Sequence, residues 1–216
     1  MATQVLSENK LLAEARNSHN KEDCMKLYDE WAATYNEDLA DASQEYVAPF
    51  LVAQAALKLS SYAKGSILDA GCGTGLVGQA LSRGGATIID GADLSPAMLK
   101  VAEKTGIYRN LMVCDLTQPI DKPDETYDIV TCCGTFTHGH VGPNPALREF
   151  ARLLKKNGFI VATILDDIWL TGGFDIEVER LEAEGLVKIV SVDLADYRKG
   201  PGDKARLIVL EKTGFP

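Results

Sequence analysis

The stretch "ILDAGCGTGLVGQAL" contains glycines at a spacing typical of a loop that holds a nucleotide cofactor. Gly73, Gly75 and Gly78 satisfy the G-x-G-x-x-G pattern of dinucleotide-binding folds. Together with Asp69 and Gly71, the first two of these glycines also spell D-x-G-x-G-x-G. Glycine lets a backbone turn tightly and approach a ligand, and a following helix points its free N–H groups at the same place. The pattern therefore predicts a cofactor loop and leaves two kinds of cofactor open.

Charge separates these two cofactors. A dinucleotide such as NAD has a pyrophosphate dianion, whereas S-adenosylmethionine has an ammonium, a carboxylate and a sulfonium and no phosphate. Asp69, two residues before Gly71, places a negative charge near the glycine turn, which disfavours pyrophosphate and suits an ammonium group. A structural role for Asp69, accepting backbone N–H groups of its own turn, is the open alternative.

Two further acids are expected at strand ends. Asp93 in "IIDGADLS" can accept from both hydroxyls of a ribose, which supports an adenosine ligand without choosing between the two cofactors. Asp115 in "LMVCDLTQPI" can accept from an adenine amine while Leu116 and Met98 flank the ring, although a lone Asp also suits a turn cap. The sequence has neither a Tyr-x-x-x-Lys pair nor a Walker pattern, so phosphate-bearing ligands are disfavoured.

The segment "FTHGH" contains two candidate general bases, His138 and His140. A free imidazole titrates near pH 6.5, which suits proton removal at cellular pH. A histidine in such a loop also serves as a cap or a hydrogen-bonded strut. His138 is the preferred base, and an extended loop would point both rings the same way. Trp169 and Phe174 are interpreted either as walls of an acceptor pocket or as core residues.

From residue 66 onward, apolar runs of strand length alternate with helical patterns, which predicts βαβ units and a parallel sheet. The expected strands are 66–70, 87–93, 110–114, 127–133, 158–165, 186–192 and 206–211. The connection "ADYRKGPGDKA" has no helical period, so the last strand is expected to return antiparallel. The prediction is an α/β, Rossmann-like, seven-stranded, mostly parallel sheet with helices on both faces.

Several residue pairs predict where helices begin and end. Ser95-Pro96 offers an N-cap followed by proline at the first helical position, and Asn144-Pro145 is expected to repeat this. Asn157-Gly158 is expected to close the second of these helices, and Gly185 the next one.

The first 61 residues have no strand signal and are predicted to form a loose arm and two helices, a cap that belongs to the same domain as residues 62–216. One helical face combines apolar and aromatic side chains: Leu27, Tyr28, Trp31, Ala32 and Tyr35. This face is interpreted as a stripe packed on the core, as a lid whose tyrosines reach a site, or as both.

Composition limits the class of protein. The chain has 216 residues with a formal net charge of -9, which disfavours nucleic acid as a partner because such binding uses clustered Lys and Arg. The five cysteines lack metal-ligand spacing, and Cys132 and Cys133 are expected as reduced thiols on opposite faces of one strand. No apolar stretch approaches the roughly 18 residues that a membrane span needs. A soluble, cytoplasmic protein without membrane insertion is expected.

Taken together, "LDAGCGTG", "GADLSPAML", "CDLTQPI" and "YDIVTCCGTFTHGHV" resemble the class I S-adenosylmethionine-dependent methyltransferases. Within them, "YDEWAATYNEDL" and "GTFTHGHVGP" are similar to the Williams–Beuren syndrome region methyltransferase-like proteins and the ubiquinone/menaquinone methyltransferase type. The resemblance implies S-adenosylmethionine across the ends of the first four strands. The residues implied in binding it are Tyr28, Tyr35, Asp69, Gly71, Cys72, Gly73, Gly75, Asp93, Leu94, Met98, Asp115, Leu116, Gly134 and Thr135. Trp31 is expected to support the tyrosines by packing.

Motifs of other methyltransferases that this sequence lacks narrow the choice of acceptor. The fourth strand is not followed by [DNS]-P-P-[YFW], so DNA and glutamine substrates are disfavoured. Asp166-Asp167 lacks the partner acid of metal-dependent O-methyltransferases, so no metal is predicted. The expected function is methyl transfer to a small-molecule acceptor. The alternatives are a non-catalytic S-adenosylmethionine-binding module or partner subunit and, more distantly, an NAD-dependent oxidoreductase. The sequence leaves the oligomeric state open.

Overall fold

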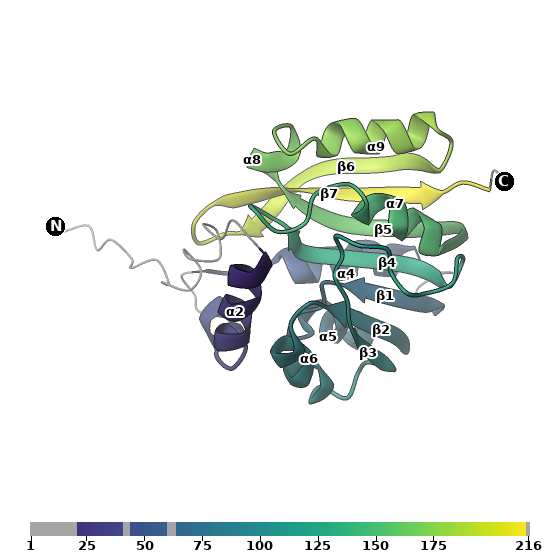
Figure 1. Cartoon of the computed structure of the whole chain (residues 1–216). Helices are drawn as coiled ribbons and strands as arrows, with labels where there is room; N and C mark the ends of the chain where they lie inside the picture. The colour runs from purple at the N-terminus through teal and green to yellow at the C-terminus, as the bar shows by residue number, and fades with distance from the viewer. Residues whose placement is uncertain (1–20, 41–43, 60–63, 215–216) are drawn as a thin grey trace.

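A single seven-stranded sheet forms the centre of the protein (Figure 1). The computed structural model describes residues 21–40, 44–59 and 64–214. The strands are β1 (Ser66–Ala70), β2 (Ile88–Asp93), β3 (Asn110–Val113), β4 (Tyr127–Phe136), β5 (Leu154–Leu165), β6 (Val187–Arg198) and β7 (Asp203–Lys212). Their order across the sheet is β3-β2-β1-β4-β5-β7-β6.

The strand order reverses between β1 and β4, which places a crevice at the carboxyl ends of the central strands. Strands β1 to β5 pair in parallel, whereas β7 is antiparallel to both β5 and β6. Ala70 at the end of β1 lies opposite Ala92 on one side and Cys132 on the other, so β1 and β2 end close together and β4 extends four residues beyond Cys132. The predicted fold class, with its antiparallel last strand, is confirmed.

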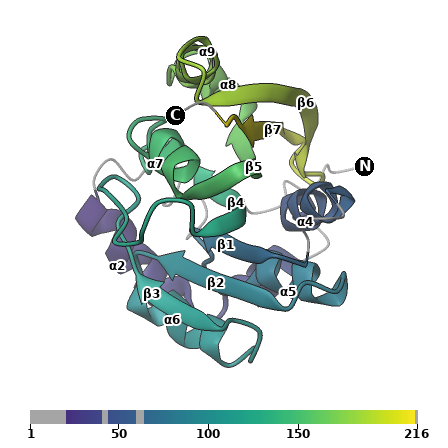
Figure 2. The ribbon, with the colours of Figure 1, turned by 90° about the vertical axis from the view of Figure 1, so that its right-hand side faces the viewer.

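Helices cover both faces of the sheet (Figure 2). They are α2 (Lys21–Trp31), α3 (Tyr35–Ala40), α4 (Ala48–Lys58), α5 (Leu76–Arg83), α6 (Pro96–Glu103), α7 (Ala146–Leu153), α8 (Asp166–Trp169) and α9 (Phe174–Ala183). On one face the core includes α7 and α9, and on the other it includes α4 and α5. Cys132 belongs to the first core and Cys133 to the second, which confirms that neighbouring cysteines face opposite sides of β4.

The predicted helix ends are confirmed only in part. Ser95 caps α6 as predicted, because its hydroxyl accepts from the N–H of Met98 at 3.1 Å. The prediction for Asn144 is wrong, since Pro145 is the residue before α7 and no side chain caps that helix. Asn157 does not close α7 either. That helix already ends at Leu153, because Leu154 is extended and pairs with Tyr127 of β4.

The last helix and the last hairpin can be compared with the predictions in the same way. Gly185 adopts φ +73° just after α9, which confirms it as a helix-terminating residue. The polar connection expected between the last two strands is shorter than predicted, because β6 runs to Arg198 and β7 starts at Asp203. Tyr197 and Arg198 are buried, so tertiary contacts keep this stretch extended.

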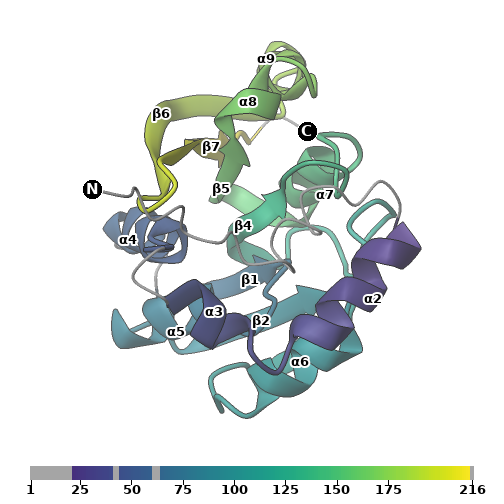
Figure 3. The same ribbon diagram turned by 90° about the vertical axis from the view of Figure 1, so that its left-hand side faces the viewer.

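The N-terminal segment lies in two places: α2 and α3 are at the carboxyl end of the sheet, and α4 packs on one of its faces (Figure 3). It forms three helices in the described residues, not the two expected, and α2 contacts α6 while α4 contacts α5, β4 and β5. Leu27, Trp31 and Ala32 are buried, which confirms the predicted apolar face of α2. Among the described residues, no helix has both the length and the apolar character that spanning a membrane requires.

Candidate cofactor and active site

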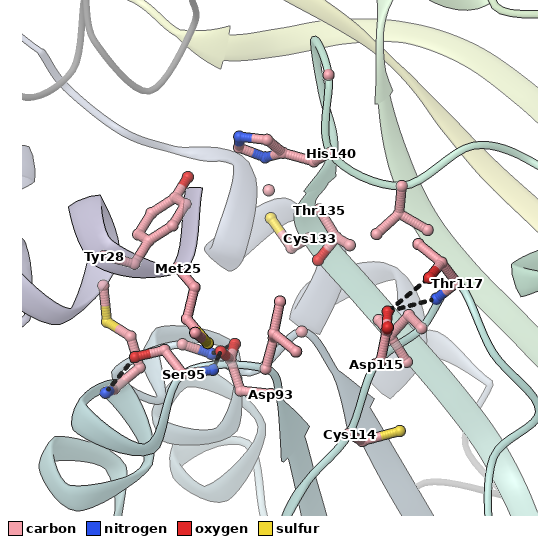
Figure 4. A pocket seen from close by; sticks show the side chains of 18 of the residues that line it. Met25, Tyr28, Asp93, Ser95, Cys114, Asp115, Thr117, Cys133, Thr135 and His140 are labelled. Carbon is pink, nitrogen blue, oxygen red and sulfur yellow. Dashed lines mark hydrogen bonds between the residues drawn. The ribbon is translucent and has the colours of Figure 1, made fainter. Parts of the chain in front are cut away.

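A cavity of about 860 Å³, measured to its open mouth, lies at the carboxyl ends of β1, β2 and β4 (Figure 4). Most of the residues predicted to form the site line it: Tyr28, Tyr35, Gly71, Gly73, Asp93, Leu94, Met98, Asp115, Leu116, Gly134, Thr135 and His140. Four predicted residues do not line it: Asp69, Cys72, Gly75 and His138. We call this space the cofactor cavity.

Other lining residues were not singled out from the sequence: Met25, Ser95, Cys114, Thr117, Cys133, Gly139 and Val141. Each of them is close in the chain to a predicted site residue, or lies one helical turn from one. Ser95 follows the acid of the second strand, and Cys114 and Thr117 flank Asp115. Met25 lies one turn before Tyr28 on α2. Proximity to the motif residues was the available signal.

The glycine loop after β1 needs its glycines for two reasons. Gly71, Gly73 and Gly75 have φ values of +71°, +52° and +95°, which L side chains rarely adopt. A Cβ at Gly71 would also lie 1.9 Å from Oγ1 of Thr135, so the loop after β1 closely approaches the end of β4. The N–H of Gly71 donates to the carbonyl of Ala92 at 2.7 Å and ties the turn to β2. Gly75 is the residue from which α5 begins.

Asp69 lies beneath this loop and is fully buried. The hydroxyl of Tyr108 donates to it at 2.7 Å and that of Thr131 at 3.1 Å. Burial raises the pKa of the Asp69 carboxyl to about 6, although these hydrogen bonds and one from the backbone of Gly78 oppose the rise. Asp69 therefore has structural contacts, but they differ from the alternative predicted: two are side-chain hydroxyls and the backbone donor is Gly78 of α5, not the turn itself.

Asp93 joins three parts of the site. One carboxylate oxygen accepts from the N–H of Gly73 at 2.8 Å, and the other from the N–H of Ser95 at 2.9 Å. Burial raises its pKa. The hydroxyl of Ser95 donates to Asp29 of α2 at 2.5 Å, so the N-terminal helix is bonded to the start of α6 beside this acid. Asp93 faces the cavity with oxygen lone pairs that can accept ribose hydroxyls.

Asp115 caps a turn and also lines the cofactor cavity. One of its oxygens accepts from the N–H of Thr117 at 3.0 Å and from its hydroxyl at 2.7 Å, which is the expected turn cap. The same residue lines the cavity beside Leu116 and Met98, both buried apolar side chains. A flat apolar slot with a carboxylate at its edge suits a nucleobase with an exocyclic amine.

The charge of the cofactor cavity distinguishes the two kinds of ligand. Its described lining contains the carboxylates of Asp93 and Asp115 and contains neither Lys nor Arg. A pyrophosphate would therefore meet two acids and no cationic side chain, whereas a sulfonium or an ammonium is favoured there. The residues present fit S-adenosylmethionine. Among the described residues, no group of three or more His, Cys, Asp or Glu could hold a metal ion.

The two histidines of the loop after β4 lie in different surroundings. Nδ1 of His140 is 2.7 Å from the hydroxyl of Thr137, and its ring meets Tyr28 edge-on at 5.7 Å between centroids. Nε2 of His138 instead lies 3.0 Å from Asp167, on a side chain that is 39% exposed. Gly139 has φ +70°, so the loop is not extended and the rings do not share a direction as expected.

A second cavity of about 480 Å³ adjoins the first, and we call it the aromatic cavity. The two cavities share Tyr28, Tyr35, Gly134 and His140. The further residues that line the aromatic cavity are Trp31, Leu39, Tyr46, Thr137, Leu165, Tyr197 and Arg198. Neither Trp169 nor Phe174 lines either cavity. Phe174 belongs to the core on the face of α7 and α9 and Trp169 packs against that core, which confirms the second of the two interpretations.

Comparisons with known proteins agree with this site. Residues 68–162 match the family model described as a methyltransferase domain. The family match, the sheet order and the lining of the cavity define a class I S-adenosylmethionine-dependent methyltransferase; the chain belongs to this family, and its cofactor is S-adenosylmethionine. Human methyltransferase-like protein 27 is 32% identical to it over 168 residues, which cover 75% of this chain and 67% of that protein.

Other relatives are more distant. The ubiquinone biosynthesis O-methyltransferase of Aliivibrio fischeri is 29% identical over 155 residues, which are 69% of this chain and 63% of that enzyme. The chain therefore spans less than two thirds of that relative. A TehB-like S-adenosylmethionine-dependent methyltransferase from Corynebacterium glutamicum has the same fold, with a TM-score of 0.64 and 24% identity. The matched region covers 87% of this chain and 100% of the Corynebacterium glutamicum chain.

Proposed function

We propose that the protein transfers a methyl group from S-adenosylmethionine to a small-molecule acceptor that binds beside Gly134 and His140. The carrying observation is that a cofactor cavity lined by carboxylates shares these two residues with a second, compact cavity. The name of the Aliivibrio fischeri relative, an enzyme of ubiquinone biosynthesis, also supports a small acceptor.

Each wall of the cofactor cavity has a distinct task in this proposal. Asp93 accepts from the ribose hydroxyls, and Asp115 accepts from the adenine amine. Leu116 and Met98 flank the adenine ring, while Tyr28 closes the outer side from α2. When bound, S-adenosylmethionine supplies an electrophilic methyl group on a sulfonium. The protein then has to align the acceptor, exclude water and remove a proton where the nucleophile carries one.

His140 is the candidate for proton removal because it borders both cavities, which His138 does not. In the tautomer whose Nδ1–H donates to Thr137, Nε2 has the lone pair that takes the proton. Tyr28 packs edge-on against the ring and restricts its orientation. Asp69 contributes indirectly, because it holds Tyr108 and Thr131 beneath the glycine loop.

Methyl-labelled S-adenosylmethionine tests the proposal with the full chain and a fractionated cell extract. We expect label in the small-molecule fraction and not in protein or nucleic acid. Gly71→Val should abolish it, because the added side chain would collide with Thr135. Label in a macromolecular fraction would contradict the small acceptor, and cofactor binding with no label in any fraction would favour the non-catalytic binding module.

A further inference from the structure

We propose that the aromatic cavity is the acceptor site and takes an uncharged, planar aromatic molecule that is methylated on a hydroxyl oxygen. This inference rests on the proposed function and names its substrate class. Four features of the cavity carry it: ring-lined walls, a neutralised charge, phenol groups at the boundary with the cofactor cavity, and an imidazole at the same boundary.

The walls suit a flat apolar ligand. Trp31 and Tyr35 meet edge-on with centroids 4.7 Å apart, and Tyr46 and Tyr197 do so at 5.1 Å. Edge-to-face pairs present both ring faces and ring edges to a neighbouring space, and a planar ring can pack against either. Leu165 adds an aliphatic surface at the end of β5. These walls converge although they come from α2, α3, β5 and β6.

The charge of the cavity is already balanced within the protein. Arg198 is the one Lys, Arg, Asp or Glu in the described lining, and its side chain is 3% exposed. Its guanidinium donates from Nε to Asp203 at 2.8 Å and from a terminal nitrogen to Gln44 at 3.1 Å. A cationic ligand would meet this guanidinium, and an anionic one would compete with the half-buried carboxylate of Asp203. A neutral ligand meets neither obstacle.

Phenol hydroxyls lie where the two cavities meet. The hydroxyl of Tyr46 is 3.3 Å from that of Tyr197. A Cβ at Gly134 would come within 2.8 Å and 3.4 Å of these two oxygens, so the glycine leaves them open to the end of β4. Burial raises the pKa of both phenols well above 10. They stay protonated and cannot serve as bases. Tyr46 donates to Tyr197, which leaves the proton of Tyr197 for a ligand oxygen.

His140 completes the site because it borders both cavities. In the reaction, the acceptor oxygen forms a bond to the methyl carbon while the bond from sulfur to that carbon breaks. The sulfur keeps the electron pair and becomes a neutral thioether, and the hydroxyl proton moves to the imidazole. The products are an aryl methyl ether, S-adenosylhomocysteine and one proton released to solvent.

Calorimetric titration of the full chain, saturated with S-adenosylhomocysteine, tests this assignment. The probes share one ring system: 2-naphthol, naphthalene, 2-naphthoate and 2-naphthylmethylamine. We expect 2-naphthol to bind at least tenfold more tightly than the anionic or the cationic probe. Tyr197→Phe removes the donor and should weaken 2-naphthol about fivefold, as for one lost hydrogen bond. Tyr46→Phe removes the group that orients Tyr197 and should weaken it less, and both variants should leave naphthalene unchanged.

Tyr127→Phe is the matched control, because it removes another buried hydroxyl, one that donates to Asp90 at 3.0 Å and lies at the start of β4. It should change the affinity of no probe. Tighter binding of a charged probe, or 2-naphthol affinity that is the same in wild type and both tyrosine variants, would overturn the inference. Labelled methyl transfer to the small-molecule fraction is scored separately, so a failure of the proposed function is distinguishable.

Discussion

The cofactor cavity and the aromatic cavity adjoin but are assembled in different ways. The cofactor cavity is built mainly from short runs at or just beyond the carboxyl ends of successive strands, namely Gly71 and Gly73, 93–95 with Met98, 114–117 and 133–135. The aromatic cavity combines Tyr46 with Tyr197, two residues that are 151 positions apart in the chain. The first is therefore encoded locally and the second by tertiary packing. Cofactor binding and acceptor binding should respond to different substitutions.

The largest difference between the effect on turnover and the effect on cofactor binding should come from His140→Ala. If His140 removes the proton, turnover should fall by roughly 10²-fold to 10⁴-fold. Affinity for S-adenosylmethionine, measured by calorimetry, should stay within about twofold because other groups hold the cofactor. His138→Ala is the control, since that ring faces Asp167 and should leave turnover nearly unchanged. Equal losses in both variants would remove the distinction between the two histidines.

Asp69→Asn probes the support beneath the cofactor cavity alone. The folded pKa of about 6 exceeds the unfolded value near 4, so between these values the folded state holds a proton that the unfolded chain has lost. The free energy of unfolding should therefore fall by about 2 kcal/mol as pH rises from 4 to 7. This contribution should be absent in the variant.

Urea unfolding at pH 4 and at pH 7 measures this pH dependence of the free energy of unfolding. Asp121→Asn, at an exposed position, should keep the wild-type difference between the two pH values. An unchanged pH dependence in Asp69→Asn would show that this carboxyl is not the titrating group.

Gly71→Ala should damage the cofactor cavity through shape. Its Cβ would lie 1.9 Å from Oγ1 of Thr135 in a backbone at φ +71°, so the loop must shift. Affinity for S-adenosylmethionine should fall at least tenfold, which is about 1.4 kcal/mol. Gly85→Ala has a comparable φ of +99° with no described atom within 4 Å, and it should lose stability without losing affinity. Equal affinities for the two variants would reject the clash as the cause.

Ser95→Ala should have the smallest effect and touches a helix that borders both cavities. It removes the cap on the N–H of Met98 and the bond to Asp29 of α2, at a cost of about 1 kcal/mol. Hydrogen exchange of the α2 amides should accelerate. Thr105→Ala, which removes a bond to the carbonyl of Ala102 at the other end of α6, should leave α2 unaffected. Acceleration in both would mean that α2 responds to general destabilisation.

What the sequence could predict follows the same division between local and tertiary encoding. The strand positions, the glycine loop and the acids at strand ends were accessible because each depends on spacing within one βα unit. The partner of Asp69 was not, because Tyr108 is 39 positions away. The choice between His138 and His140 depends on the left-handed turn at Gly139. The aromatic cavity needs Tyr197, which the sequence placed in a polar connection.

The most direct test of the account titrates the full chain with S-adenosylmethionine and, in parallel, with NAD. The central claim is that a cavity with two carboxylates and neither Lys nor Arg in its described lining selects a cationic, phosphate-free adenosine ligand. We predict micromolar binding of S-adenosylmethionine and no measurable heat with NAD. Binding of NAD with equal or higher affinity would contradict the charge argument on which the assignment of the cavity depends.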